Sequence, residues 1–278
     1  MHCAIKQLCA AFICLISLNV LGQTTGPSTS FQASYTLTYK KFVSSQSYKT
    51  ANTVLIYNGT ESIFTFEKMI DFANIQQERR LTADEILAQI LPFYYLIYLK
   101  DDEATHYEAI GSDTYKVSHK FSLSWKLSEN DTLIGGFKCK KATLESFGRN
   151  WTAWYAPEIA ITTGPYKFKG LPGLILRIFD SEKNFDFTLN EFKRGVFNFN
   201  KIFENYFINE DNRPTIGIEA DKFYRLRKKF NEMSLDQKIK FMNRDDPAGG
   251  NIQIESAAGE PLRATELRKV TNSIERID

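Results

Sequence analysis

The sequence predicts a mainly β protein of the α+β class. Its expected core is a single antiparallel, strongly curled sheet or incomplete barrel with a few short helices. Aromatic residues make up 14% of the chain, and they recur with β-branched residues in short runs. Polar turns separate these runs, and helical periodicity occurs in few places. Successive short strands joined by short turns favour antiparallel pairing.

The first 22 residues have the order of a secretory signal peptide. Lys6 is their only lysine or arginine, residues 7–21 are almost wholly apolar, and Gly22-Gln23 places a small residue at the cleavage position. The apolar run is about 15 residues long, shorter than the ~20 that a spanning helix needs. We therefore expect export to the periplasm or cell envelope, with cleavage near Gly22-Gln23.

Cleavage would leave one β-rich domain at residues 23–244 and a polar tail at residues 245–278. The tail lacks aromatic residues, so we expect it to be loosely ordered. Of the four cysteines only Cys139 would remain, which excludes an internal disulfide. The net charge of +2 would fall to about +1, and such a chain is a poor nucleic-acid binder.

Strands are expected first at Phe31–Tyr39, where apolar and polar residues alternate. Val54–Tyr57 and Ser62–Phe66 flank Asn58-Gly59, the strongest short signal of a hairpin. A further pair, at residues 94–99 and 107–110, flanks an acidic stretch.

That acidic stretch is a weak candidate for a metal site. Asp101, Asp102, Glu103 and His106 lie within six residues, but the alternating oxygen ligands and the glycine of a calcium loop are missing. A solvent-exposed hairpin tip explains it better, and we expect neither metal nor cofactor.

Three more strands are expected in the second half of the chain. Trp151–Tyr155 follows a turn at residues 148–150. Leu174–Phe179 and Phe185–Leu189 are separated by a short polar turn, which predicts that they pair as neighbours.

Helices are expected at three places. Thr82–Glu85 is a capping box before a helix that Pro92 ends. Apolar residues at helical spacing run from Phe223 to Met233, and Ser234–Gln237 is predicted to cap a second helix. The first of these C-terminal helices carries a basic set that predicts either a solvated face or docking to anionic headgroups or a membrane protein. The set is Lys222, Arg225, Arg227, Lys228 and Lys229.

Cys139 is a candidate nucleophile because Lys138, Lys140 and Lys141 surround it. Alternation with Phe137 instead places it on the apolar face of a strand, where a thiol is inert. We therefore expect no catalytic role for Cys139.

The chain resembles the GLPGLI family through the hexapeptide Gly170-Leu171-Pro172-Gly173-Leu174-Ile175. The resemblance extends upstream over about fifty residues, with one departure at Ala160, where similar proteins often carry proline. The residues that carry it and that we expect to be structural are Cys139, Trp151, Trp154, Tyr155, Gly164, Pro165, Gly170, Leu171, Pro172 and Gly173.

The resemblance implies an exported Bacteroidetes envelope protein, with genes often near TonB-dependent transporters. It implies no established reaction and no catalytic residues. The residues themselves predict that Gly170 and Gly173 adopt positive φ or a close backbone approach, and that Pro172 fixes φ. The apolar residues that follow predict a strand covered on both faces.

The sequence therefore favours a non-enzymatic envelope protein that binds an apolar ligand or a partner protein in an aromatic-lined pocket, as periplasmic lipoprotein carriers do. One alternative is a periplasmic hydrolase or peptide-processing enzyme using Cys139, His106, His119 or the pair Glu158 and Asp180. Another is an accessory subunit of a TonB-dependent outer-membrane transporter, with at most peripheral contact to the membrane.

Overall fold

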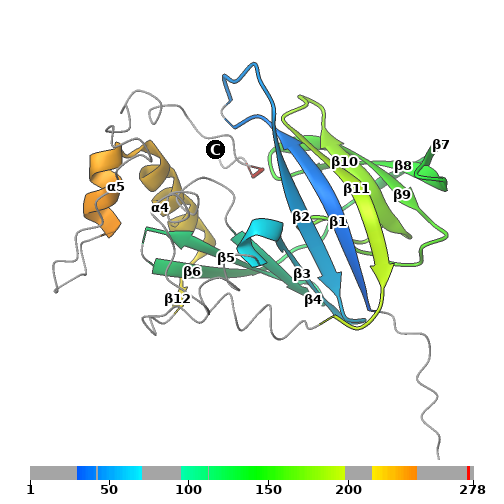
Figure 1. Cartoon of the computed structure of the whole chain (residues 1–278), viewed down its shortest axis with the longest axis horizontal. Coiled ribbons are helices and arrows are strands. Elements are labelled where there is room, and N and C mark those ends of the chain that lie inside the picture. The colour runs from blue at the N-terminus through cyan, green and yellow to red at the C-terminus, as the bar shows by residue number, and fades with distance from the viewer. Residues whose placement is uncertain are drawn as a thin grey trace, which may run out of the picture.

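The computed structural model describes residues 30–41, 43–70, 95–111, 113–197, 215–242 and 274–275. The expected signal peptide, the capping box at Thr82–Glu85 and all but two residues of the expected tail lie outside the described residues. The arrangement is shown in Figure 1.

Twelve strands form one sheet in the order β12-β6-β5-β4-β3-β2-β1-β11-β10-β9-β8-β7. The strands are β1 (Phe31–Tyr39), β2 (Lys49–Tyr57), β3 (Glu61–Phe66), β4 (Tyr95–Lys100), β5 (Glu103–Ile110), β6 (Asp113–Lys120), β7 (Lys126–Ile134), β8 (Phe137–Ser146), β9 (Arg149–Ala156), β10 (Leu174–Asp180), β11 (Phe185–Arg194) and β12 (Ile216–Gly217). The helices are α4 (Ala220–Glu232) and α5 (Leu235–Met242).

The sheet consists of two antiparallel meanders joined side by side. β1 to β6 pair in succession, β7 to β11 do the same, and β1 pairs with β11 to join them. Only the two-residue strand β12 is parallel to its neighbour, β6. The mainly β, antiparallel prediction is confirmed.

The sheet is curled, and two distances require it. β6 and β7 lie ten positions apart in the strand order, about 48 Å in a flat sheet. Residues 121–125 alone connect them, and such a linker spans at most about 20 Å. On the concave side, the rings of Phe64 in β3 and Phe187 in β11 approach to 6.0 Å across two intervening strands.

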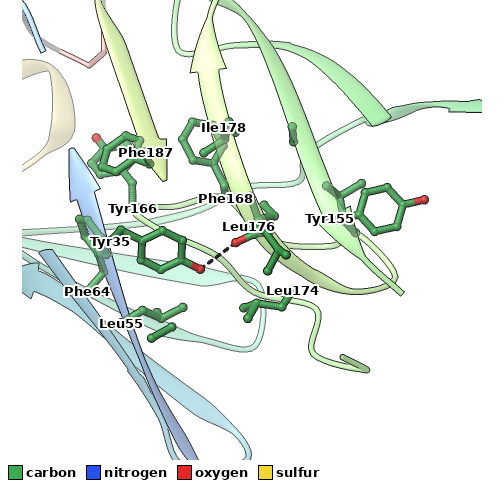
Figure 2. Close-up of a cluster of buried hydrophobic side chains, with 14 of the residues drawn as sticks. Tyr35, Leu55, Phe64, Tyr155, Tyr166, Phe168, Leu174, Leu176, Ile178 and Phe187 are labelled. Atoms are coloured by element: carbon green, nitrogen blue, oxygen red, sulfur yellow. Dashed lines mark hydrogen bonds between the residues drawn. The ribbon is translucent and has the colours of Figure 1, made fainter. Parts of the chain in front are cut away.

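The main core fills this concave side. In β1 the side chains of Phe31, Ala33, Tyr35 and Leu37 are all fully buried, and they alternate with partly exposed polar residues. Tyr35 donates its hydroxyl to the carbonyl of Ile175 at 2.8 Å, two strands away, in the cluster that Figure 2 shows. The alternation read from the sequence thus gives the strand its buried face.

Helix α4 packs on the β5–β6 end of the sheet. Phe223 and Phe230 are buried against Ile110, Tyr115 and Val117. A capping box begins α5, because Ser234 Oγ accepts from the Gln237 backbone and Gln237 Oε1 accepts from the Ser234 backbone. Both C-terminal helices are therefore confirmed. Within the described residues, no helix combines the length and the apolar character that crossing a bilayer requires.

The hairpins are confirmed, with one correction. β2 and β3 pair around Asn58, and β10 pairs with β11 as expected. The turn before β9 is Phe147-Gly148, not residues 148–150, because φ is positive at both residues and Arg149 already pairs with Ser146.

β10 also departs from the expectation that both of its faces are covered. The first three residues, Leu174 to Leu176, are fully buried, but Arg177 is exposed and Phe179 is partly exposed. The register with β9 shifts between Ile175 and Arg177. This β-bulge at Leu176 turns the second half of the strand, so that one of its faces meets solvent.

Candidate functional site

The loop between β9 and β10 carries the hexapeptide and folds back on itself. Gly170 donates its backbone N–H to the Thr162 carbonyl at 2.7 Å, and Leu174 donates its own to the Ile159 carbonyl at 3.0 Å. Thr163 and Lys169 form an isolated antiparallel β-bridge. These bonds hold the two arms of the loop together. The loop presents residues 164–168 at its far end, which we call the motif tip.

The glycines of the loop are required either by close contacts or by a positive φ. A Cβ on Gly173 would lie 2.3 Å from the Ala156 carbonyl oxygen, and φ there is +156°. Gly170 has φ of +93°, and a Cβ on Gly164 would lie 2.9 Å from Ile175 Cβ. The prediction for Gly170 and Gly173 is confirmed, since both have positive φ and Gly173 also has the close approach.

The motif tip is inserted into the concave side of the sheet. Tyr166, Lys167 and Phe168 are all at most 2% exposed. The Phe168 ring lies 4.7 Å from that of Trp151, and the Tyr166 ring lies 5.7 Å from that of Tyr95 in β4. Figure 2 shows Tyr166 and Phe168 among the core side chains. The tip thus packs against strands from both meanders.

Tyr166 adopts a strained backbone conformation within this tip. Its φ is +56°, in the left-handed region that bulky residues rarely enter. Strain of this kind persists where surrounding contacts hold it. Here the ring packing and a hydrogen bond of the hydroxyl supply those contacts.

The side chain of Lys167 ends at a carboxylate from far along the chain. Its Nζ lies 2.6 Å from Glu275 Oε1, and the Lys167 side chain is 0% exposed. Tyr166 donates its hydroxyl to the same oxygen at 2.7 Å, and Tyr224 of α4 donates to Glu275 Oε2. We call Tyr166, Lys167 and Tyr224 the carboxylate cradle.

The cradle keeps Glu275 ionised. Burial alone would raise the pKa of Glu275, but the Lys167 charge and hydrogen bond, with the Tyr224 hydroxyl, hold that pKa well below its usual range. Burial lowers the pKa of Lys167, and the Glu275 charge opposes that change. The two charges therefore stabilise one another in a place that excludes water.

The neighbouring Ile274 is held by separate contacts. Its side chain is 3% exposed within the main core, and its carbonyl accepts a hydrogen bond from Arg149 Nε at 3.0 Å. Arg149 is positioned by Asp180, whose Oδ2 lies 2.9 Å from Arg149 Nη1. Figure 1 shows this short red segment on the side of the sheet where α4 lies.

A second charged group lies beside the cradle. Arg227 Nη1 lies 3.3 Å from Glu108 Oε2, and His106 Nε2 lies 2.9 Å from the same oxygen. Burial lowers the pKa of His106, which leaves the imidazole neutral. The sequence suggested that Arg227 lies on a solvated basic face, but the structure places it elsewhere. Its side chain is only 14% exposed.

Two buried polar atoms next to these charges have no hydrogen-bond partner among the described residues. They are the Tyr95 hydroxyl and His106 Nδ1. The Tyr95 hydroxyl responds to the charges of Glu108, Arg227 and Glu275, since burial and these carboxylates raise its pKa well above normal. The group therefore retains hydrogen-bonding capacity.

Cys139 lies in an apolar environment. Its side chain is fully buried on β8, and burial raises the pKa of the thiol to about 11. The hydrogen bond that the thiol donates goes to the Phe137 carbonyl at 3.5 Å, and not to a histidine. The prediction that Cys139 lies on an apolar face is confirmed.

The other residues singled out in the sequence have structural contacts. Trp151 is buried and donates its indole N–H to Ser146, Tyr155 is 2% exposed, and Trp154 lies on the opposite, partly exposed face of β9. Leu171 is buried, while Pro172 is exposed next to it. Pro165 is buried in the motif tip, where its carbonyl accepts from Phe168.

The acidic hairpin tip contacts the motif loop. Lys169 donates its ammonium to the Asp101 carbonyl and lies 3.4 Å from Asp102 Oδ1. His106 points instead into the group around Glu108. The described residues hold no group of three or more His, Cys, Asp or Glu side chains placed to bind a metal.

One family model matches the region around this loop. A family model described as a protein of unknown function (Porph_ging) matches residues 145–177. This range runs from the end of β8 through β9 and the motif loop into β10. A search of the curated proteins found no match to the chain.

Among solved structures, the chain is similar to PNGF-II with a TM-score of 0.51 at 12% identity. The similarity covers 74% of this chain and 34% of that one, so this chain spans about a third of PNGF-II. At this identity the likeness concerns the fold alone.

Two further structures are less similar. An uncharacterized conserved protein from Thermus thermophilus has a TM-score of 0.35 at 12% identity, covering 69% of this chain and 91% of that one. A LolA superfamily protein from Nitrosomonas europaea has a TM-score of 0.30 at 11% identity, covering 64% and 91%.

Proposed function

We propose that this chain is a non-enzymatic protein of the cell envelope that binds a segment of a partner protein or an apolar ligand on the concave side of its curled sheet. The observation that carries the proposal is the insertion of Glu275 into the carboxylate cradle. A segment distant in sequence is bound there through its side chains and backbone, as a ligand would be.

The composition of the concave side supports this function. Aromatic and aliphatic side chains pack there around the carboxylate cradle, where Tyr166 and Lys167 meet Glu275. Binding sites in proteins commonly combine an apolar lining with a small number of placed polar groups. The aromatic side chains expected from the sequence supply the lining.

The environment of Cys139 supports a non-enzymatic function. A nucleophilic cysteine needs a depressed pKa and a base within hydrogen-bond reach. The Cys139 thiol has a raised pKa, and the contact that it donates goes to the Phe137 carbonyl at 3.5 Å. Glu158 and Asp180 also have different partners. Asp180 is bound to Arg149, and Glu158 accepts a hydrogen bond from the Lys138 backbone N–H.

Native mass spectrometry of the full chain purified from envelopes tests the proposal. A copurifying peptide, protein or apolar molecule that organic extraction or mild denaturation releases would support it. Turnover of peptide or ester substrates that Cys139→Ala abolishes, without any copurifying molecule, would contradict it.

A further inference from the structure

The contacts of Ile274 and Glu275 define a site that recognises three different features of a peptide. The main core takes an aliphatic side chain, Arg149 Nε binds the backbone carbonyl of the same residue, and the carboxylate cradle binds the following carboxylate. These contacts use a backbone carbonyl together with two side chains, which a peptide offers and a simple carboxylate does not.

The residues on the receptor side of this site come from elements other than its occupant. Arg149 is held by Asp180, and Lys167 and Tyr166 are fixed by the motif loop. Tyr224 lies on α4, where the neighbouring Phe223 is fully buried. None of these elements includes residues 274–275. Arg149, Tyr166, Lys167 and Tyr224 are thus presented by the sheet, the loop and the helix.

An anion is required at this position. Lys167 is completely buried and Glu275 is the carboxylate that it contacts, while Glu108 is already bound by Arg227. A buried cation without a partner is strongly unfavourable. Any segment that replaces Glu275 must therefore bring a carboxylate of its own to the same point.

We propose that Arg149 and the carboxylate cradle form a peptide-binding site for an aliphatic residue followed by glutamate, which the chain's own Ile274–Glu275 occupies. A segment of a partner protein with this chemistry enters by displacing Ile274–Glu275. This inference rests on the proposed binding function and names the class of partner.

The test uses the full-length chain and a fluorescent peptide of residues 270–278, VTNSIERID. Anisotropy measures its binding to the wild-type chain and to Glu275→Gln, in which the internal competitor has lost its charge. The matched peptides carry glutamine at the position of Glu275 or alanine at that of Ile274.

The site predicts that VTNSIERID binds Glu275→Gln at least tenfold more tightly than it binds the wild-type chain, a difference of about 1.4 kcal/mol. Both matched peptides should bind the variant at least tenfold more weakly than VTNSIERID. Equal binding of the glutamate and glutamine peptides, or no binding of any of them, would overturn the proposal.

A second variant protects the test against misfolding. Ile274→Ala keeps the Lys167 and Glu275 charges paired but weakens the internal segment, so VTNSIERID should again bind more tightly than to wild type. Unchanged affinity in folded Ile274→Ala would also count against the site. If peptides fail but a copurifying ligand is found, the proposed function stands and this site alone is wrong.

Discussion

Lys167 Nζ and Glu275 Oε1 lie 2.6 Å apart although 108 residues separate them in the sequence. The lysine comes from the tip of the hexapeptide loop, and the glutamate comes from the segment that the sequence marks as a polar tail. Both side chains are buried. Their pairing connects the motif that resembles a known family to the concave side of the sheet.

The first prediction concerns the close backbone approach at Gly173. Gly173→Ala should lower the free energy of unfolding by more than about 2 kcal/mol, because the added Cβ would meet the Ala156 carbonyl at 2.3 Å. Chemical denaturation measures the change. Gly217→Ala is the matched control, since its Cβ would come no closer than 3.8 Å to Lys116, and we expect a change within about 0.5 kcal/mol.

A Gly173→Ala variant as stable as Gly217→Ala would mean that the chain at Ala156 moves aside without cost. The loop would then not be tightly packed against the end of β9.

The second prediction concerns the reactivity of Cys139. At pH 7 the Cys139 thiol of the native protein should react with a thiol reagent at least about a hundredfold more slowly than in denaturant, because this thiol is buried and has a raised pKa. Absorbance of the released chromophore measures the rate. Fast labelling of the native chain would reopen the catalytic alternative.

The third prediction concerns the dependence of stability on pH. Burial lowers the folded-state pKa of His106, so between that pKa and about 6.5 the unfolded chain binds more protons than the folded chain. The free energy of unfolding should therefore fall as the pH drops below about 6.5, by up to about 1.4 kcal/mol per pH unit.

His119 also has a pKa lowered by burial and contributes in the same direction, so each histidine needs its own variant. His106→Gln should flatten this part of the pH profile more than His119→Gln, because His106 is more deeply buried. Identical slopes in wild type and His106→Gln would show that His106 titrates normally in the folded chain.

Local pattern was enough to predict most of the sheet. The alternation in residues 31–39 determined which side chains of β1 are buried, and Asn58-Gly59 located the hairpin of β2 and β3. The same rule failed at Leu176, because a β-bulge adds one residue to the strand and periodicity of two does not anticipate it.

The buried charges could not be predicted in the same way. A lysine is ordinarily solvated, and only a partner far away in the sequence makes the burial of Lys167 tolerable. Position 167 did carry a signal, since the lysine lies between Tyr166 and Phe168 in a loop bounded by turns that pair glycine with proline. Helical spacing alone could not predict that Arg227 is largely buried, because its partner Glu108 lies 119 residues away in the sequence.

A double-mutant cycle on Lys167 and Glu275 tests the central claim, that the hexapeptide loop carries a buried carboxylate-binding lysine. Lys167→Met and Glu275→Gln should each lower the free energy of unfolding by about 3 kcal/mol, because each leaves a buried group unpaired. The exposed pair Lys138 and Asp131, 3.1 Å apart, is the control and should couple by less than about 0.5 kcal/mol.

Denaturant unfolding of the wild-type chain, both single variants and the double variant gives the coupling free energy. The predicted value for Lys167 and Glu275 is about 2 kcal/mol, with the double variant more stable than the sum of the single losses implies. Additive losses, with a coupling no larger than that of the exposed control pair, would contradict the buried pairing.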